Sequence, residues 1–330
     1  MTVAAQTVER KSVPSVFRTL LRDQPLLPLS VLLVALVFVV WGFSESTRNL
    51  GWVAVILRAS VPVAILAGCQ TLTMLTGGID LSVGYVASMA GFVTATFVNQ
   101  PGGWVLGMVV AIAAAGLVGL VNGIGVGVFR VHPLIVTLGM GLVVLGFSNV
   151  WQLQTLQTGA GVPAELRTLG SGLFADVVPY SLTVFIPIAL ILVLGLRRTG
   201  YGRMLYALGD NPVAARLSGV RSWQVLIVLY VISSVLAAIA GLIFAGLSNT
   251  ANVTLVAGQL LPSVAAAVIG GTSIVGGRGS YTGTMVGALI LVVLTALLTI
   301  IQLPEPMRQI VFGSIVVLVA AAYTRVTAES

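Results

Sequence analysis

Long runs of apolar residues fill most of the chain, and short polar or glycine-rich stretches separate them. A helix that crosses a bilayer core about 30 Å thick needs roughly 20 apolar residues. Runs that end at charges, Gly/Pro clusters or polar stretches predict ten membrane-spanning helices, at 26–44, 58–76, 83–98, 104–128, 134–152, 180–196, 224–246, 262–275, 282–301 and 309–323. The pattern predicts an all-α polytopic membrane protein, although 83–98 and 262–275 are short for a perpendicular crossing.

Composition supports a membrane domain over a soluble one. Of the 330 residues, 58% are hydrophobic and 8% are charged, whereas soluble domains are roughly 45–50% apolar and about 25% charged. No soluble surface tolerates that much exposed apolar area. We therefore expect one transmembrane domain over 25–324, with short tails at 1–24 and 325–330.

The distribution of basic residues predicts the orientation. The tail 1–24 holds Arg10, Lys11, Arg18 and Arg22 and lacks the apolar core and cleavage site of a signal peptide, so the first span is expected to stay in the mature protein. With the N-terminus inside, twelve of the 16 Lys and Arg residues lie on the cytoplasmic side and four lie outside. Since cytoplasmic loops carry the excess of Lys and Arg, both termini are predicted to be cytoplasmic.

The scarcity of reactive side chains excludes most catalytic functions. The chain has one lysine, one histidine and one cysteine, at Lys11, His132 and Cys69. A His/Cys metal site and a disulfide framework cannot be assembled from these. A P-loop needs a lysine directly after its glycines, and the one lysine lies in the N-terminal tail, which excludes a P-loop. The sequence shows no recognisable nucleophile–base pair. We expect neither an enzyme nor a bound cofactor, and the scattered arginines fit topology signals better than a nucleic-acid surface.

A first informative stretch, Gly77–Gly84, places an acid between two apolar runs. Asp80 at the centre of a membrane helix would cost about 2.5–3.5 kcal/mol, whereas an Asp ahead of a helix is a good N-cap. Two interpretations stay open: an interfacial turn with a cap, or a segment that lines or gates a pathway.

A second stretch, 197–223, lies on the predicted cytoplasmic side. Asp210 or Asn211 is suited to be an N-cap, Pro212 to be the first helical residue and Gly219 to end the helix. This predicts a helix of about two turns, which is unstable alone. It must pack on its own domain or enter a groove on a partner. On the outside, 153–179 is predicted to hold a short surface helix that Pro163 begins.

A third stretch, Gly270–Ser280, is rich in glycine but has no lysine and no preceding strand, which argues against a nucleotide site. Glycines here favour close helix packing, or a break that exposes backbone groups to a cavity. Its double glycine repeats the one at 77–78, and paired interruptions in two halves of a chain point to transport sites.

These stretches resemble the ribose/xylose/galactose-type permeases, the membrane subunits of bacterial carbohydrate-importing ABC transporters. GGIDLSVG, TGYGRMLYALGDNPVAARLSGV and VIGGTSIVGGRGS are similar to segments of that family, and Asn122-Gly123 and the run 132–139 resemble its middle region. The likeness extends over about 26–323. The residues 210–212 depart from the family, in which acidic, non-proline residues often follow the Asn.

The resemblance implies a type II ABC importer-like permease in the bacterial inner membrane. It implies a second permease subunit, identical or not, a periplasmic binding protein that delivers a sugar, and an ATP-binding subunit, usually a fused double cassette. The loop 197–223 then holds the coupling segment, and the candidate coupling residues are Arg203, Gly209, Asp210, Asn211, Pro212, Ala214, Ala215, Arg216 and Gly219. The candidate pathway residues are Gly77, Gly78, Asp80, Ser82, Asn122, Gly270, Gly271 and Thr272.

One alternative of a different class stays open. An ion-coupled secondary transporter of a small polar solute would use a buried ionisable group, and Asp80 is the acid nearest to a span interior. The identity of the solute is not readable from the sequence.

Overall fold

The computed structural model describes residues 26–98, 102–155 and 161–328, with side chains up to Leu318. The predicted tail 1–24 lies outside these residues. Each of the ten predicted spans contains a helix. These helices are α2 (Leu26–Phe43), α3 (Leu50–Leu75), α4 (Val83–Thr96), α5 (Gly103–Gly127), α6 (Pro133–Thr155), α8 (Leu182–Arg198), α11 (Ser222–Ser248), α12 (Leu260–Ile269), α13 (Tyr281–Ile300) and α14 (Glu305–Ala328).

The number of crossings is a separate matter from the number of helices. Among the described residues, six helices are long and apolar enough to cross a membrane. A seventh crossing is counted if α8 and the following α9 (Gly200–Asp210), which bend by 67° at their junction, form one span. The helices α4 and α12 are apolar but short. The chain is therefore a polytopic all-α membrane protein.

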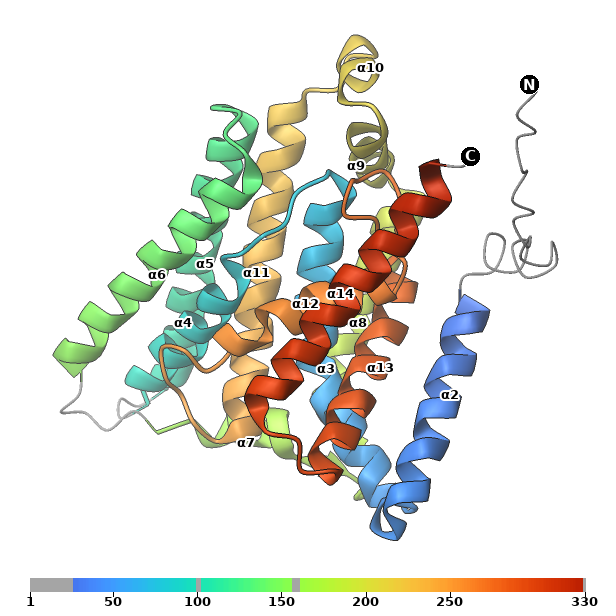
Figure 1. The fold of residues 1–330 in the computed structure, drawn as a ribbon. Coiled ribbons are helices and arrows are strands. Elements are labelled where there is room, and N and C mark those ends of the chain that lie inside the picture. Colours follow the sequence, from blue (N-terminus) through green and yellow to red (C-terminus); the bar gives the residue numbers. More distant parts are fainter. Residues whose placement is uncertain (1–25, 99–101, 156–160, 329–330) are drawn as a thin grey trace, which may run out of the picture.

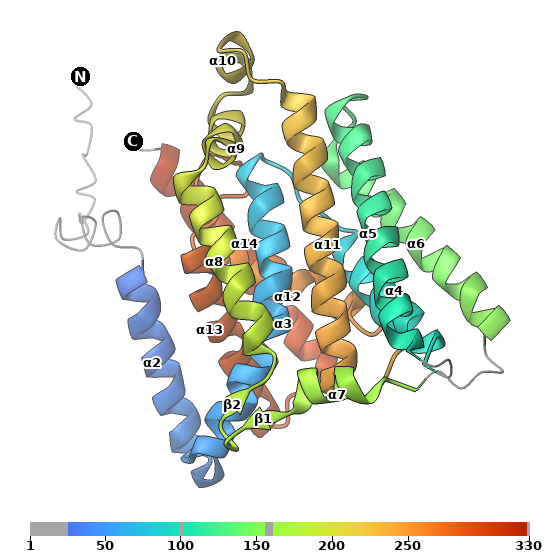
Figure 2. The same cartoon turned by 180° about the vertical axis from the view of Figure 1, so that it is seen from behind.

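Smaller elements lie at the two ends of this bundle. Figures 1 and 2 show α9 and α10 (Pro212–Leu217) at one end, and α7 (Ala164–Ser171) with the strands β1 (Leu173–Phe174) and β2 (Val178–Pro179) at the other. The two strands are antiparallel and pair Leu173 with Pro179. The 3₁₀ turns η1 (Glu45–Thr47) and η3 (Ala257–Gln259) precede α3 and α12. The two ends are called the α10 end and the α7 end below.

The core forms around α3 and α11, which the other helices surround. The helix α11 packs against α5, α4 and α3, and α13 packs against α3 and α12. Large side chains such as Ile65, Leu229 and Leu291 are fully buried between them. The helix α3 has 26 residues and contains Pro62, and the guanidinium of Arg58 donates a 2.6 Å hydrogen bond to the carbonyl of Ser171 at the end of α7.

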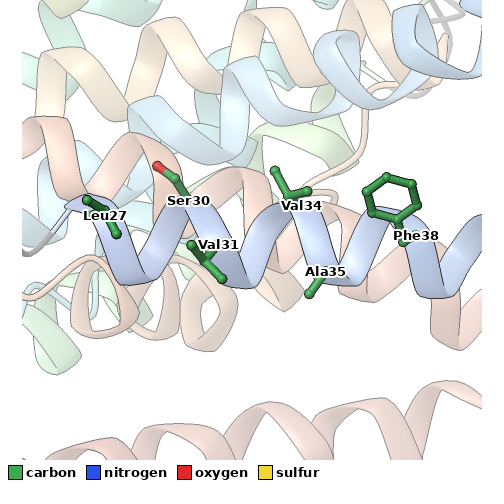
Figure 3. A pocket seen from close by; sticks show the side chains of 6 residues that line it. All are labelled: Leu27, Ser30, Val31, Val34, Ala35 and Phe38. Atoms are coloured by element: carbon green, nitrogen blue, oxygen red, sulfur yellow. The ribbon is translucent and has the colours of Figure 1, made fainter. Parts of the chain in front are cut away.

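The helix α2 lies at the edge of the bundle and presents an apolar face outward. Val31, Val34 and Phe38 are 60%, 54% and 62% exposed, and Figure 3 shows them along a shallow surface groove of this helix. The hydroxyl of Ser30 donates to the carbonyl of Leu26 at 2.9 Å. Because apolar side chains face outward and the polar one is satisfied within the helix, this face is suited to contact lipid.

Two of the predicted spans are broken, each by a non-helical segment that precedes a short helix. Residues 76–82 precede α4, and residues 249–259 precede α12 and include η3 (Figure 1). The second of these segments packs against α4 inside the bundle, where the N–H of Val256 donates to the hydroxyl of Ser88 at 2.9 Å. Gly84 lies beside the carbonyl of Val256 and leaves no room for a larger side chain. The helices in the predicted spans 83–98 and 262–275 are therefore short, and irregular segments precede both of them.

Candidate functional site

The stub helix α10 forms where the capping pattern predicts it. Of the two residues proposed as N-cap, Asn211 takes the position, and its side-chain oxygen accepts the N–H groups of Val213 and Ala214 at 3.1 and 3.0 Å. Pro212 is the first helical residue. Gly219 has φ +87°, and the N–H groups of Gly219 and Val220 return to the carbonyls of Arg216 and Ala215. These two bonds form a Schellman motif, which favours glycine at this position.

Exposure divides the candidate coupling residues of α10 into two groups. Ala214 and Arg216 are exposed, whereas Ala215 is buried against the protein's own bundle. The most exposed apolar side chains of the helix are Val213, at 57%, and Leu217, at 85%. Sequence reasoning missed both, because a Val and a Leu in a short helix carry no signal of which side faces solvent. One face of α10 therefore packs on the protein's own domain, and the opposite face is open to solvent.

The helix α9 was not predicted from the sequence. Thr199 is its N-cap and accepts the N–H of Gly202 at 3.1 Å. The hydroxyl of Tyr206 donates to the carbonyl of Gly279 at 2.8 Å, and Arg203 is exposed on the same helix. The helix thereby binds the loop that precedes α13.

Three chain segments meet at the C-terminal end of α9, and the contacts are made by backbone. A side chain at Gly209 would overlap the carbonyl of Leu75, at the end of α3, and the N–H of Gly277. The same N–H donates to the carbonyl of Leu75 at 3.0 Å. Gly276 in turn lies against Gly77, whose φ of +76° requires glycine in the turn after α3. We call these contacts between 75–77, 209–210 and 275–277 the glycine junction. It holds α9 against the entry to the first broken span.

The second double glycine lies close by but makes its own contacts. A side chain at Gly270 would collide with the backbone of Gly283 and Thr284 on α13, and Gly271 follows with φ +88°. The hydroxyl of Thr272 lies 3.4 Å from that of Thr284, which is 2.7 Å from the hydroxyl of Thr71 on α3. Gly270 and Thr272 therefore pack α12 and the turn after it against α13.

Asp80 lies in a fully buried polar cluster together with Ser82 and Asn122. Its carboxylate accepts the N–H and the hydroxyl of Ser82 at 2.9 and 2.6 Å, and the hydroxyl of Ser233 on α11 at 3.3 Å. The amide of Asn122 donates to the hydroxyl of Ser82 at 3.0 Å. All four of these residues are fully buried. In this conformation the three predicted residues contact one another and none of them lines an open space.

The N-cap position of α4 is taken by Ser82, so Asp80 supports the helix entry from two residues before the cap. The backbone of Asp80 is held from α3, because the side-chain amide of Gln70 donates to its carbonyl at 2.9 Å and accepts its N–H at 3.4 Å. Sequence reasoning missed Gln70 and Ser233, although a glutamine inside an apolar run was a usable signal. Gly78 lies beside the Tyr230 hydroxyl and Pro133, with little space for a side chain.

No group of three or more His, Cys, Asp or Glu side chains that could hold a metal is present in the described ranges of the chain. Two features of the described structure bear on function. One is a protruding, capped helix that bears exposed apolar and basic side chains, and the other is a pair of broken spans that the glycine junction connects to it.

Comparisons with known proteins give a consistent result. Residues 52–320 match the family described as branched-chain amino acid transport system / permease component. The chain is 32% identical to the fructose import permease protein FrcC of Rhizobium meliloti, over 90% of this chain and 83% of the relative. It is 34% identical to the ribose import permease protein RbsC of Escherichia coli (strain K12), over 79% and 82%.

A third relative is the autoinducer 2 import system permease protein LsrC of Yersinia enterocolitica, which is 30% identical over 80% of this chain and 73% of the relative. No solved structure matches the chain.

Proposed function

The chain belongs to the permease-component family that matches residues 52–320, and from that premise we propose that it is the permease subunit of an ABC importer for a sugar. Relatives named for the import of fructose, ribose and autoinducer 2 support a carbohydrate-like solute. They favour this function over an ion-coupled secondary transporter. The solute would be a pentose, a hexose or a related carbohydrate, delivered by a periplasmic binding protein.

The observation that carries the proposal is the helix α10. It protrudes from the bundle (Figure 1), it is capped at both ends, and it exposes Val213, Arg216 and Leu217. Such a helix suits a groove on a partner protein. We propose that this partner is the ATP-binding subunit, and that Arg203 and the segment 209–219 form the contact that transmits its movement.

The contacts behind α10 support a mechanical role. Through the glycine junction, a displacement of α9 and α10 acts directly on Gly77 and on the loop 275–277. Gly77 leads into the broken span that contains α4, and 275–277 follow the broken span that contains α12. Because backbone atoms make these contacts, little side-chain rearrangement can absorb the movement. The residues from Gly77 to Ser82, together with Asn122, then form the gate of the proposed pathway, and Gly270–Thr272 anchor its second half.

We propose that the α10 end faces the cytoplasm of a bacterial inner membrane, with both termini inside. The described connections at this end carry seven arginines, whereas those at the α7 end carry four, which agrees with the positive-inside rule. The seven are Arg130, Arg197, Arg198, Arg203, Arg216, Arg221 and Arg278. Ten crossings result if α4 and α12, each with the segment before it, α8 with α9, and α14 all span the membrane. A second permease subunit would complete the pathway.

The test is reconstitution of the permease in vesicles with an ATP-binding subunit and a binding protein from the same bacterium. We expect ATP-dependent uptake of a labelled pentose or hexose, with ATP hydrolysis stimulated by the loaded binding protein. Omission of either partner should abolish uptake. Uptake that follows an imposed proton or sodium gradient without ATP would contradict the proposal and restore the secondary transporter.

A further inference from the structure

The segment 249–259 is the one long non-helical stretch that the described part of the chain carries into the interior of the bundle from the α7 end. It begins where α11 ends beside α7, since Gly246 packs against Leu166. It reaches α4 at Ser88 and Gly84, where Val256 makes its contacts. These two residues are eight and twelve positions from the end of α4 at Thr96, which corresponds to about 12 to 18 Å of helix. The segment therefore reaches well into the depth of the apolar core.

Polar side chains of this segment are exposed on the way to that depth, and they bond partly to each other, since the side-chain oxygen of Asn252 accepts the N–H of Thr254 at 3.0 Å and its hydroxyl at 3.3 Å. Asn252 and Thr254 are exposed, as is Gly258, while Val253 and Val256 between them are buried. Hydrocarbon offers no partners for such groups, and non-helical backbone at membrane depth occurs where it is buried in protein or lines a water-filled cavity. The alternation of exposed polar and buried apolar residues indicates that one side of the segment faces water.

A cavity of about 280 Å³ lies at the inner end of the segment, between η3–α12 and α14. Gly258 and Leu261 line one side, and Glu305, Gln309 and Phe312 line the other. At about 30 Å³ for each water in the liquid, the volume corresponds to about nine waters, which is the size of a small solute. No atom lies within 4 Å of the position that a Cβ on Gly258 would occupy.

The lining suits a neutral, hydroxyl-bearing molecule. The amide of Gln309 both donates and accepts hydrogen bonds, and the carboxylate of Glu305 accepts them. Glu305 also lies 3.8 Å from the guanidinium of Arg308, which compensates its charge. Phe312 and Leu261 supply apolar surface for the C–H groups of such a molecule.

From this placement, which rests on the proposed function, we propose that the outer half of the solute pathway runs along 249–259 and ends in the cavity between α12 and α14. A neutral polyhydroxylated solute contacts Gln309 and Glu305 there before the inner gate at Asp80 and Ser82 opens. None of the pathway residues suggested by the sequence lies in this cavity.

The first test is thiol labelling of the whole importer in intact cells, with Cys69 replaced by Ser. Gly258→Cys and Thr254→Cys are compared with Val34→Cys, which lies nine positions from the end of α2 on its exposed apolar face (Figure 3). A membrane-impermeant thiol reagent added outside should label the first two about tenfold faster than the third, because the reagent reacts with the water-exposed thiolate. Equally slow labelling of all three would overturn the proposal.

The second test measures solute uptake by cells that carry the complete importer. Gly258→Trp should block uptake by filling the cavity, whereas Gly258→Ala should retain it. Gln309→Leu should reduce uptake roughly fivefold to tenfold, as expected for the loss of one hydrogen bond. Normal uptake by Gly258→Trp would refute the route. A failure of the proposed function shows separately, as absence of uptake by the wild type, and leaves the labelling result interpretable.

Discussion

The contact between α10 and the proposed ATP-binding subunit leads to a quantitative prediction for Leu217. This side chain is 85% exposed at the tip of the protruding helix, and the perturbation is Leu217→Ala. Alanine is the best helix former, and Asn211 and Gly219 still cap the helix. The variant should therefore keep α10 folded and the permease as stable as the wild type.

The magnitude follows from the area that a groove would cover. Burying an exposed Leu side chain completely contributes about 1.5–3 kcal/mol. For a side chain that is 85% exposed, this becomes about 1.3–2.5 kcal/mol. Since about 1.4 kcal/mol is a factor of ten in an equilibrium constant, we expect the Kd for the ATP-binding subunit to rise roughly 10- to 70-fold.

The assay is titration of the ATP-binding subunit against permease in lipid nanodiscs, together with the thermal unfolding midpoint of each variant. Leu50→Ala is the matched control, because Leu50 is 67% exposed at the opposite end of the bundle. It should bind as the wild type does. If Leu217→Ala also binds with wild-type affinity, α10 does not dock through its apolar face, and the coupling contact must be sought elsewhere at the α10 end.

Three further predictions concern the cap, the orientation and the gate. Asn211→Ala removes both cap bonds, should destabilise α10 by about 1 kcal/mol and should lower ATPase stimulation several-fold, whereas Asn211→Asp should restore it; equal stimulation in the two variants would contradict a role for the cap. Cysteines at Ser171 and Ser218, without Cys69, should react with impermeant reagents from opposite sides of the membrane, and labelling of both from outside would exclude the proposed orientation. Gly78→Leu, beside Tyr230 and Pro133, should insert normally but reduce uptake severely, and normal uptake would make the turn after α3 an ordinary exposed one.

The parts of the fold that the sequence predicts best are those with local causes. The helix α10 was predicted with its first residue and its final glycine, and with its N-cap narrowed to Asp210 or Asn211, because these signals lie within nine positions of one another. The helices of the spans were located for the same reason, since apolar runs are local. The helix α9 was not predicted, because it holds glycines at 200 and 202 and makes a tertiary contact, from Tyr206 to the carbonyl of Gly279, that no local pattern shows.

What could not be predicted depends on contacts between distant segments. The sequence shows the two double glycines, but not the contact of Gly209 with Leu75 and Gly277 that brings three segments together. Likewise, the two short spans were visible as short runs. The packing of the segment before α12 against α4 was not visible, because it depends on Ser88 and Val256, which lie 168 positions apart.

The helix α3 contacts both ends of the protein. Its last residue, Leu75, belongs to the glycine junction, and Arg58 near its other end holds the carbonyl of Ser171. With 26 residues it is about 39 Å long, so it acts as a lever between the two faces. Pro62 has no N–H to donate to the carbonyl of Arg58, and bending is therefore easiest at the residue that holds α7. A force applied at the α10 end would therefore pivot the helix near Arg58, and a movement of the glycine junction would reach the carbonyl of Ser171 at the α7 end.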